Sequence, residues 1–544
     1  MSFSNTTSVS QGAAEAVRIL HTYLHSSSLH VGSPLVKFEH AMITACACIV
    51  VVLGLRALFS RKRRSLPLPP GPRGLPILGN LFDMPRSTYW RVFDNWAKQY
   101  GDVVHLNILG KSVILLGSAE ATTDLLEHRT AIYSDRPGFP IMDMIGHEWN
   151  FALMKYGKDW REQRRLFSTQ YTSVKGLHMF YDAHRSSTSK LLMDVLKNPD
   201  EYTEHLRLRS GRLIFDVTYG IVVESVEDPI CKVAGDVMEV VSFALSPPML
   251  VFNAAAIMEF IPKWLGGSAF GLRVQKWRDD IREFRTGPFE VCKKNLNKGV
   301  ARPSYTASLL QELSPAEGSH EEDMIRDTAA IAYGAAFESS VTSAEIFILT
   351  MALFPEVQKR AQEEIDRVVG TNRLPDFADR ERLPYVTAVM KEVLRWHPPA
   401  PMGIPRQLRE DDTYKGYHLP RGAVVMGNVW AITHDEKKYP EPFAFKPERY
   451  LADDGTLDCS TNDPSRYAFG FGRRACPGKF LAEDSLWLTI AHFLSVFNMS
   501  FAEGTPSKIE FLNGTVTRPV PHKYKISPRS ENSKQLVECA VGAL

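Results

Sequence analysis

One cysteine stands in a short segment rich in glycine and arginine, directly before a strongly apolar stretch. Residues 469–478 read FGFGRRACPG, with Cys476 as the only sulfur. Pro477 is the residue type favoured at the first position of a helix, so Cys476 is expected to cap a helix that follows. The positive end of that helix, together with Arg473 and Arg474, is expected to lower the pKa of the thiol. The pattern predicts a thiolate at this position.

A thiolate can act as a nucleophile, a redox sensor or a metal ligand. Gly470, Gly472 and Gly478 allow the main chain to approach the sulfur closely and leave room for a flat group. A nucleophilic cysteine needs a nearby base, and the only local histidine, His492, lies about four helical turns further on. These features favour a ligand, and an inert cysteine in an ordinary glycine-rich turn is the alternative.

A carboxylate stands in the middle of a long apolar stretch, residues 327–354, which is expected to form a buried helix. A buried carboxylate is costly unless it is paired or solvated, so Glu338 needs an explanation. The next residue, Ser339, can hold a water molecule, or its hydroxyl can bond to a carbonyl one turn earlier.

Two further pairs have helical spacing. Glu392 and Arg395 lie three residues apart on a helix that Pro398 is expected to end, which places both side chains on one face. Trp160 and Arg164 lie one turn apart in the sequence YGKDWREQRRLF. An amphipathic surface helix with a basic face is the alternative interpretation of the second pair.

The cysteine segment resembles the F-x-x-G-x-R-x-C-x-G signature of the cytochrome P450 superfamily, in its fungal microsomal branch. The matching positions are Phe469, Gly472, Arg474, Cys476 and Gly478. The resemblance implies that Cys476 is the axial thiolate ligand of iron in haem b, which favours O–O cleavage. It also implies that Phe469 packs near the sulfur and that Arg474 pairs with a haem propionate, so that this loop binds the cofactor.

The same resemblance gives roles to the other pairs. Trp160 and Arg164 match the family's W-x-x-x-R, where they contact the propionates. Glu392 and Arg395, with Arg449 from FKPERY, match a Glu-Arg-Arg triad that is structural and does no chemistry.

The apolar stretch matches the family's A-G-x-[DE]-T motif with two departures. The glycine is replaced by Ala336 and the threonine by Ser339, whereas the acid is kept as Glu338. The resemblance implies that Glu338 and Ser339 are catalytic and deliver protons for oxygen activation. A working relay with altered coupling and a modified reaction that depends less on the relay are both open.

The family pattern also predicts which residues contact the substrate. They are Met142, Met144, Ile145, Ala336, Phe337, Met402, Ile404 and Val516. Most of these side chains are apolar, which suggests terpenoid, steroid or polycyclic aromatic substrates, although methionine-rich pockets adapt readily.

Near the N-terminus, residues 41–59 form an apolar stretch with Arg56 as its only charge, and RKRR follows at 61–64. We expect a single transmembrane anchor in the endoplasmic reticulum, with the catalytic domain in the cytosol. A cleaved signal peptide is the alternative. In this topology the sequon at Asn5 is lumenal and available for glycosylation.

The chain has 544 residues, of which 44% are hydrophobic, enough for a large core. We expect a mainly α protein with small β-sheets, the cytochrome P450 fold, after one transmembrane helix. The expected segments are a lumenal tail (1–40), the anchor (41–59), a basic and proline-rich linker (60–82), the catalytic domain (83–528) and a C-terminal tail (529–544). The net charge of +2 gives no reason to expect nucleic acid, and seven scattered cysteines fit a reducing compartment.

These features together predict a monomeric monooxygenase that inserts one atom of O2 into an apolar substrate of secondary metabolism or xenobiotic oxidation. Its electrons are expected from NADPH through NADPH-cytochrome P450 reductase. Two alternatives are a haem-thiolate isomerase or dehydratase that needs no reductase and a non-catalytic haem-binding scaffold.

Overall fold

The structure is a computed structural model, and it describes residues 66–172, 174–225, 227–245, 269–458, 462–504 and 509–542. They belong to a compact unit that spans Leu66–Leu544. The expected anchor at 41–59, the basic cluster at 61–64 and the sequon at Asn5 lie outside the described residues.

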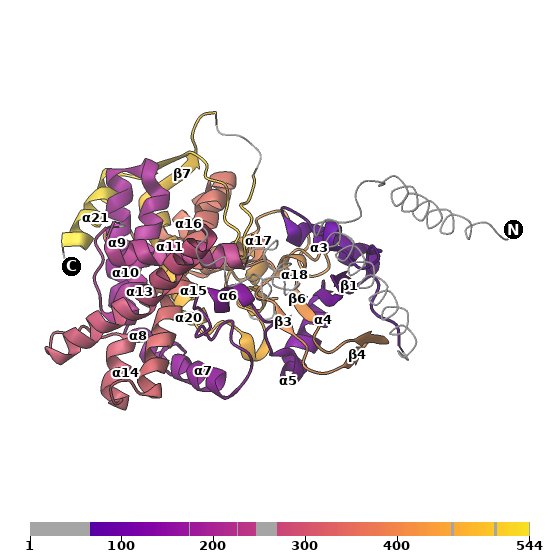
Figure 1. Ribbon diagram of the computed structural model, residues 1–544. Coiled ribbons are helices and arrows are strands. Elements are labelled where there is room, and N and C mark those ends of the chain that lie inside the picture. Colours follow the sequence, from indigo (N-terminus) through magenta and orange to yellow (C-terminus); the bar gives the residue numbers. More distant parts are fainter. Residues whose placement is uncertain are drawn as a thin grey trace, which may run out of the picture. The chain divides into compact units, whose positions relative to one another are not determined.

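Helices make up most of this unit (Figure 1). In the first half of the chain they are α3 (Tyr89–Tyr100), α4 (Ala119–Thr123), α5 (Thr130–Tyr133), α6 (Pro140–Met144), α7 (Lys158–Tyr171), α8 (Val174–His178), α9 (Tyr181–Lys197), α10 (Tyr202–Tyr219) and α11 (Pro229–Ala244). In the second half they are α13 (Ala269–Asn297), α14 (Tyr305–Leu313), α15 (His320–Leu353), α16 (Pro355–Val368), α17 (Pro384–Trp396), α18 (Val429–Thr433), α19 (Ser465–Ala468), α20 (Lys479–Val496) and α21 (Glu531–Gly542).

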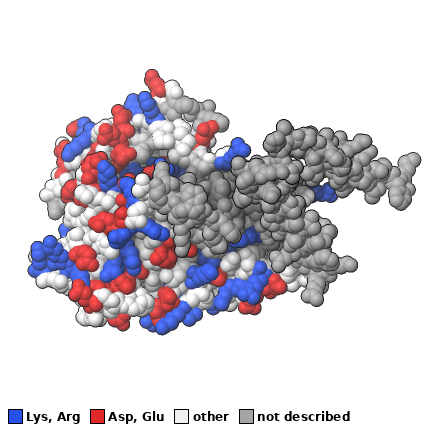
Figure 2. Space-filling model, in the orientation of Figure 1, with Lys and Arg blue, Asp and Glu red and all other residues white. Residues whose placement is uncertain are grey.

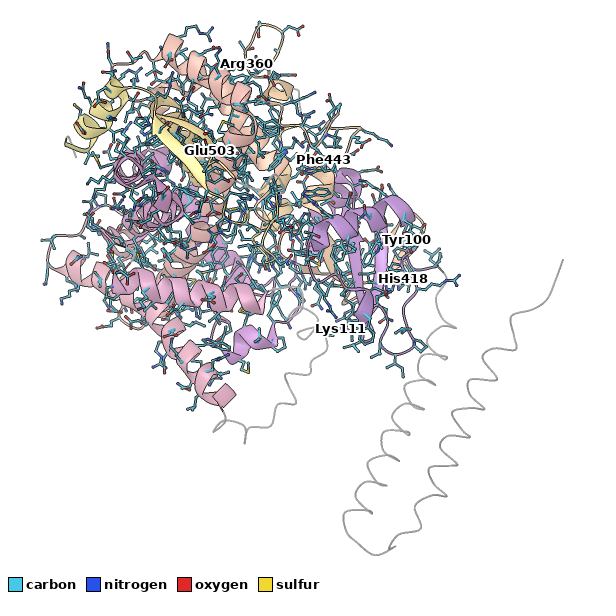
Figure 3. All side chains as sticks on the ribbon, turned by 90° about the horizontal axis from the view of Figure 1, so that it is seen from above. Tyr100, Lys111, Arg360, His418, Phe443 and Glu503 are labelled. Atoms are coloured by element: carbon cyan, nitrogen blue, oxygen red, sulfur yellow. The ribbon has the colours of Figure 1, made fainter. Side chains whose placement is uncertain are left out.

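The strands form three small sheets. They are β1 (Val103–Ile108), β2 (Lys111–Leu116), β3 (Arg406–Gln407), β4 (Asp412–Tyr414), β5 (Tyr417–Leu419), β6 (Val424–Gly427), β7 (Phe497–Phe501) and β8 (Tyr524–Pro528). The largest sheet has the order β1-β2-β6-β3, in which only β2 and β6 run parallel. Tyr100, Lys111 and His418 mark the end of the domain that holds this sheet and α3, away from most of the helices (Figure 3). The expected α-rich fold with small sheets is confirmed.

Helix α15 runs through the middle of the helical part (Figure 1). It begins seven residues earlier than the sequence predicted, because the Ser319 side chain accepts a hydrogen bond from the N–H of Glu322 and caps it. Most of its residues from Ile325 to Met351 are buried. Within the described residues it is the one helix whose length and apolar composition suit a membrane span. However, 67% of its apolar 18-residue stretch is buried inside the domain. These contacts make α15 a core helix of the domain.

Two of the expected boundaries differ from the structure. The proline-rich segment from Leu66 belongs to the folded unit, because His105 donates its N–H to the carbonyl of Pro70 and Asn80 donates its side-chain amide to Pro72. The expected tail, 529–544, contains α21, whose Val537 is fully buried against α9 and α20. The folded domain therefore extends further at both ends than 83–528.

Candidate functional site

Cys476 lies in the turn between a short 3-10 helix and α20. Its own N–H donates to the carbonyl of Phe469 (2.7 Å), and the N–H of Gly478 donates to its sulfur. Gly472 adopts a φ of 51°, and a Cβ there would lie 2.4 Å from the carbonyl oxygen of Leu126. The turn that presents the sulfur therefore requires glycine.

The electrostatics of Cys476 differ from the sequence-based expectation. The residue at the cap of α20 is Gly478, so Cys476 lies two residues before it, and Arg473 donates to the hydroxyl of Tyr156. Burial raises the pKa of the Cys476 thiol, and the N–H of Gly478 and the charge of Arg164 oppose this only in part. The predicted low pKa is therefore wrong for the protein alone. An anionic sulfur here needs a bound metal cation as its partner.

The sulfur faces a cavity of about 590 Å³ between α15 and the cysteine turn. Cys476 has accessible surface although protein surrounds it, because that surface faces the cavity. The cavity also brings together most of the predicted site residues, namely Trp160, Arg164, Glu338, Ser339, Phe469, Arg474 and Gly478. On the opposite wall, Ala335 and Ala336 on α15 leave open space that larger side chains would fill.

Five of the arginines that line the cavity have no carboxylate partner. They are Arg136, Arg164, Arg209, Arg406 and Arg474, and none of the ion pairs in the described part of the chain includes any of them. Burial lowers the pKa of Arg406 to about 10, and burial with the nearby charge of Arg406 lowers that of Arg474 to about 9. The pKa of Arg136 is lowered well below its usual value by burial and by the charges of Arg474 and Arg406. Because the guanidinium group of arginine stays protonated in proteins, the cavity is suited to a ligand with more than one negative charge.

Main-chain carbonyls hold the guanidinium groups of Arg136, Arg406 and Arg474 in place. Arg474 donates to Ser134 (2.9 Å), Phe151 (3.1 Å) and Met154 (2.6 Å), and its guanidinium lies 4.4 Å from the centre of the Trp160 ring. Arg136 donates to Ala152, Ile404 and Pro405, and Arg406 donates to Leu126 and Phe471. Sequence analysis missed Arg136 and Arg406, because nothing in their local sequence sets them apart from surface arginines.

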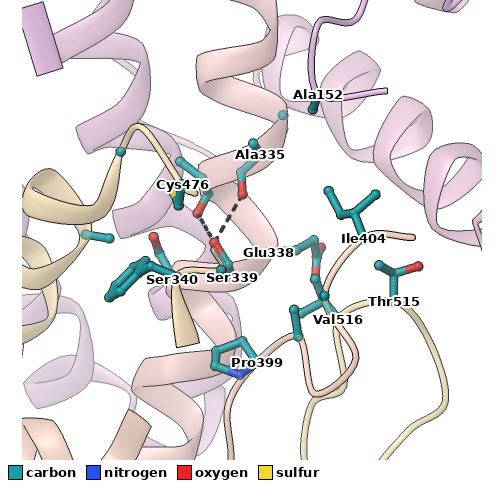
Figure 4. Close-up of a pocket in the computed structure, with 18 of the residues that line it drawn as sticks. Ala152, Ala335, Glu338, Ser339, Ser340, Pro399, Ile404, Cys476, Thr515 and Val516 are labelled. Atoms are coloured by element: carbon teal, nitrogen blue, oxygen red, sulfur yellow. Dashed lines mark hydrogen bonds between the residues drawn. The ribbon is translucent and has the colours of Figure 1, made fainter. Parts of the chain in front are cut away.

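The acid and hydroxyl on α15 point in different directions (Figure 4). Ser339 lies on the side of Cys476, and its hydroxyl donates to the carbonyl of Ala335 (3.1 Å), with a longer contact to Ala336 (3.4 Å). Glu338 lies toward Val516. The backbone contact that the sequence left open for Ser339 is therefore the one observed.

The carboxylate of Glu338 has a basic partner on a neighbouring helix. Its Oε1 lies 3.4 Å from a guanidinium nitrogen of Arg207 on α10, and both side chains are about one quarter exposed. The Arg207 guanidinium also lies 5.3 Å from the centre of the Phe337 ring. This ion pair resolves the cost of placing an acid in an apolar helix.

The three residues of the expected triad meet at the end of α17. Glu392 and Arg395 form a two-pronged ion pair at 2.7 and 2.8 Å, and both are fully buried. Arg449 lies 3.4 Å from the same carboxylate, which also accepts from the hydroxyl of Tyr450 and the N–H of Lys446. Arg395 further donates to three carbonyls of residues 433–444, so the triad fixes that loop to α17.

Half of the residues predicted to contact the substrate lie on the cavity wall. Ala336, Met402, Ile404 and Val516 line the cavity.

Met142, Met144, Ile145 and Phe337 do not line the cavity. Met142 and Ile145 are buried in the packing around α6, and the ring of Phe337 lies between α15 and α10 beside Tyr333. In their place, the segment after α6 contributes His147, Asn150, Phe151, Ala152 and Leu153.

Comparison with known proteins agrees with this geometry. The model of the cytochrome P450 family matches residues 69–526. The chain belongs to the cytochrome P450 family. Among its relatives, a cytochrome P450 monooxygenase of Armillaria gallica is 38% identical over 90% of this chain and 97% of that protein. Cytochrome P450 monooxygenase 208 of Postia placenta is 34% identical over 91% and 96%, and tryptamine 4-monooxygenase of Psilocybe cyanescens is 35% identical over 87% and 95%. The chain is thus similar to fungal monooxygenases over nearly their whole length.

The cytochrome P450 family implies a haem ligated by a cysteine thiolate, and the cavity fits this group. Cys476 is the one cysteine among the described residues that line the cavity, small residues on α15 lie opposite, and the arginines without carboxylate partners suit the two carboxylates of haem. The protein is therefore a haem-thiolate monooxygenase by its family and by the chemistry of this cavity.

Proposed function

We propose that Cys476 is the iron ligand of this monooxygenase and that Trp160, Arg164 and Arg474 bind the haem propionates, with Arg136 and Arg406 as further partners. The observation that carries this proposal is that the Cys476 thiol faces a cavity lined by several buried or half-buried arginines without carboxylate partners. Phe469 and Gly478 shape the turn around the sulfur, and Glu392, Arg395 and Arg449 brace the segment before it.

Bound haem supplies the activation of dioxygen, which no side chain of the protein can perform alone. The arginines of the protein would bind the propionates at the edge of the haem, and Cys476 would supply the anionic sulfur. The apolar walls of the cavity would keep water out. Ser339 lines the cavity and donates its hydroxyl proton to the carbonyl of Ala335, and the neighbouring Glu338 is paired with Arg207. We infer that these two residues move protons from the Arg207 side of α15 toward the reaction centre, with Ser339 as the final donor.

We infer that the substrate is an apolar organic molecule. Leu213, Ile214, Val241 and Leu245 form cavity walls together with Met402, Ile404 and Val516. Terpenoids, steroids and polycyclic aromatic compounds suit such walls, and one relative acts on tryptamine according to its name. The chain is proposed to be a microsomal enzyme of secondary metabolism or xenobiotic oxidation, anchored in the endoplasmic reticulum by residues 41–59 and glycosylated at Asn5.

Electrons are proposed to come from NADPH through NADPH-cytochrome P450 reductase. The described surface in Figure 2 carries interspersed positive and negative residues, in line with the small net charge. Arg161 and Arg165 on α7 and Arg473 beside the cysteine turn are exposed and could steer an acidic partner.

Oxidation of a panel of terpenoids, steroids and polyaromatic compounds by membranes that contain the protein and a fungal reductase tests this function. The proposal predicts a product that gains one oxygen atom and that requires NADPH, the reductase and O2. Turnover to an isomer or a dehydrated product without the reductase would instead support the isomerase or dehydratase alternative.

A further inference from the structure

A second cavity lies beside the substrate cavity, between α10, α11, α13 and α15, and has a volume of about 200 Å³. Four aromatic rings form much of its wall, those of Phe215, Tyr219, Phe284 and Tyr333. Because an apolar cavity of roughly 150 Å³ can hold benzene, this space suits a ligand with a single ring.

A carboxylate stands at the rim of this second cavity without a basic partner. Glu283 is exposed, and no ion pair in the described part of the chain includes it. Its neighbours Arg282 and Arg285 pair with other carboxylates. A Cβ on Gly287 would lie 2.5 Å from Oε1 of Glu283, so the carboxylate occupies the space that the missing side chain leaves.

Pro288 lies inside α13 and also lines the cavity. Its ring adds apolar surface beside the aromatic side chains. The wall therefore combines aromatic faces with one carboxylate, and no lysine or arginine of the described residues lines it.

Aromatic faces and acceptors that carry negative charge attract organic cations. We propose that the second cavity binds a small organic ammonium ion that carries an aromatic or branched apolar group. The rings of Phe284 and Tyr333 contact the apolar part, and Glu283 neutralises the charge at the rim. Binding here requires neither haem nor turnover.

The second cavity shares a wall with the substrate cavity, because Phe284 lines both. The ring of Phe284 contacts Tyr333 with a centroid separation of 5.9 Å, and its Cζ would lie 3.3 Å from a Cβ on Gly334. An occupant of the second cavity would hold this ring toward the substrate cavity. The ammonium ion is therefore expected to change the affinity for substrate, and this coupling, unlike the binding itself, rests on the proposed function.

Calorimetric titration of the full-length holoenzyme with benzyltrimethylammonium tests the proposal. This probe has no lone pair on nitrogen and cannot ligate iron. We expect saturable binding, about tenfold weaker in Glu283→Gln and lost in Val233→Trp, which fills the cavity. Glu290→Gln, an exposed acid on α13 that does not line the cavity, serves as the matched control and should bind like the wild type.

Equal affinity of the wild type and Glu283→Gln would overturn the proposal, as would the absence of saturable binding in the wild type. Equal affinity for neopentylbenzene, the neutral carbon isostere, would show that charge is not recognised. Should Val233→Trp fail to fold, the Glu283→Gln and isostere comparisons still decide the question. Because dissociation constants do not depend on turnover, failure of the proposed monooxygenase function would leave this result unchanged.

Discussion

Buried arginines without carboxylate partners are the most informative side chains of this protein. Arg136 and Arg406 are about 95% buried, and both donate only to carbonyl oxygens among the described residues. A buried charge without an ionic partner is strongly unfavourable, so the folded domain is completed by an anionic ligand. We propose that the haem propionates are this ligand.

Arg406→Gln is expected to accelerate haem loss. The substitution removes a buried charge and its charge-assisted bonds, which should speed haem transfer to apomyoglobin by roughly tenfold. Arg409→Gln changes an exposed arginine of the same segment and should release haem at the wild-type rate. Equal rates for all three proteins would show that Arg406 does not hold the cofactor.

Ser339 is the position where the proton relay can be tested alone. Ser339→Ala is expected to bind substrate like the wild type but to release more hydrogen peroxide per NADPH consumed, because the hydroxyl that supplies the proton is missing. Ser339→Thr keeps a hydroxyl at the same place and should retain the wild-type ratio. If Ser339→Ala shows unchanged peroxide release, Ser339 is not part of the relay.

The triad residues act at the scale of structural elements. Glu392 on α17 forms ion pairs with Arg395 on the same helix and with Arg449 in the segment before the cysteine turn. These contacts join α17 to that segment. Removing Glu392 or Arg395 would leave the other buried charge without its partner. No residue of the triad lines the cavity. The triad therefore supports the haem side of the fold without touching the reaction.

Glu392→Gln should lower the free energy of unfolding by about 3–5 kcal/mol, the usual cost of breaking a buried ion pair. Urea unfolding followed by circular dichroism measures this difference. Glu381→Gln, at an exposed position close to α17, is the control and should change stability by less than about 1 kcal/mol. Wild-type stability in Glu392→Gln would contradict the structural role.

Elements with a local signature could be predicted from the sequence. Helix α17 with Glu392 and Arg395, helix α7 with Trp160 and Arg164, and the strands β1 and β2 follow from spacing and alternation within a few residues. The faces of α6 and α15 could not be predicted, because packing against α10 and α11 decides which side of a helix meets the cavity. For this reason Met142 and Phe337 were expected at the cavity, whereas neither lines it in the structure.

At the scale of the whole molecule, buried histidines link stability to pH. Burial lowers the pKa of His492 to about 4 and that of His397 to about 3, below the usual value near 6.5. At a pH between about 4 and 6.5, the folded state therefore binds fewer protons at these histidines than the unfolded state does. Their contribution to stability is complete above about pH 6.5 and declines as the pH falls toward 4.

The melting temperature is accordingly expected to fall between pH 6.5 and 4.5. His492→Gln keeps a donor for the carbonyl of Pro375 but removes the titrating ring, and it should make this decline shallower. His320→Gln changes an exposed histidine and should leave the slope as in the wild type. Identical slopes for all three proteins would argue against this origin of acid sensitivity.

The absorption spectrum of the reduced, CO-bound protein tests the central claim most directly. We expect the full-length wild type to show the Soret band characteristic of a thiolate ligand, and Cys476→His to lose that band while keeping haem in the cavity. A wild-type spectrum typical of a neutral ligand, or a thiolate band that persists in Cys476→His, would contradict the assignment of Cys476.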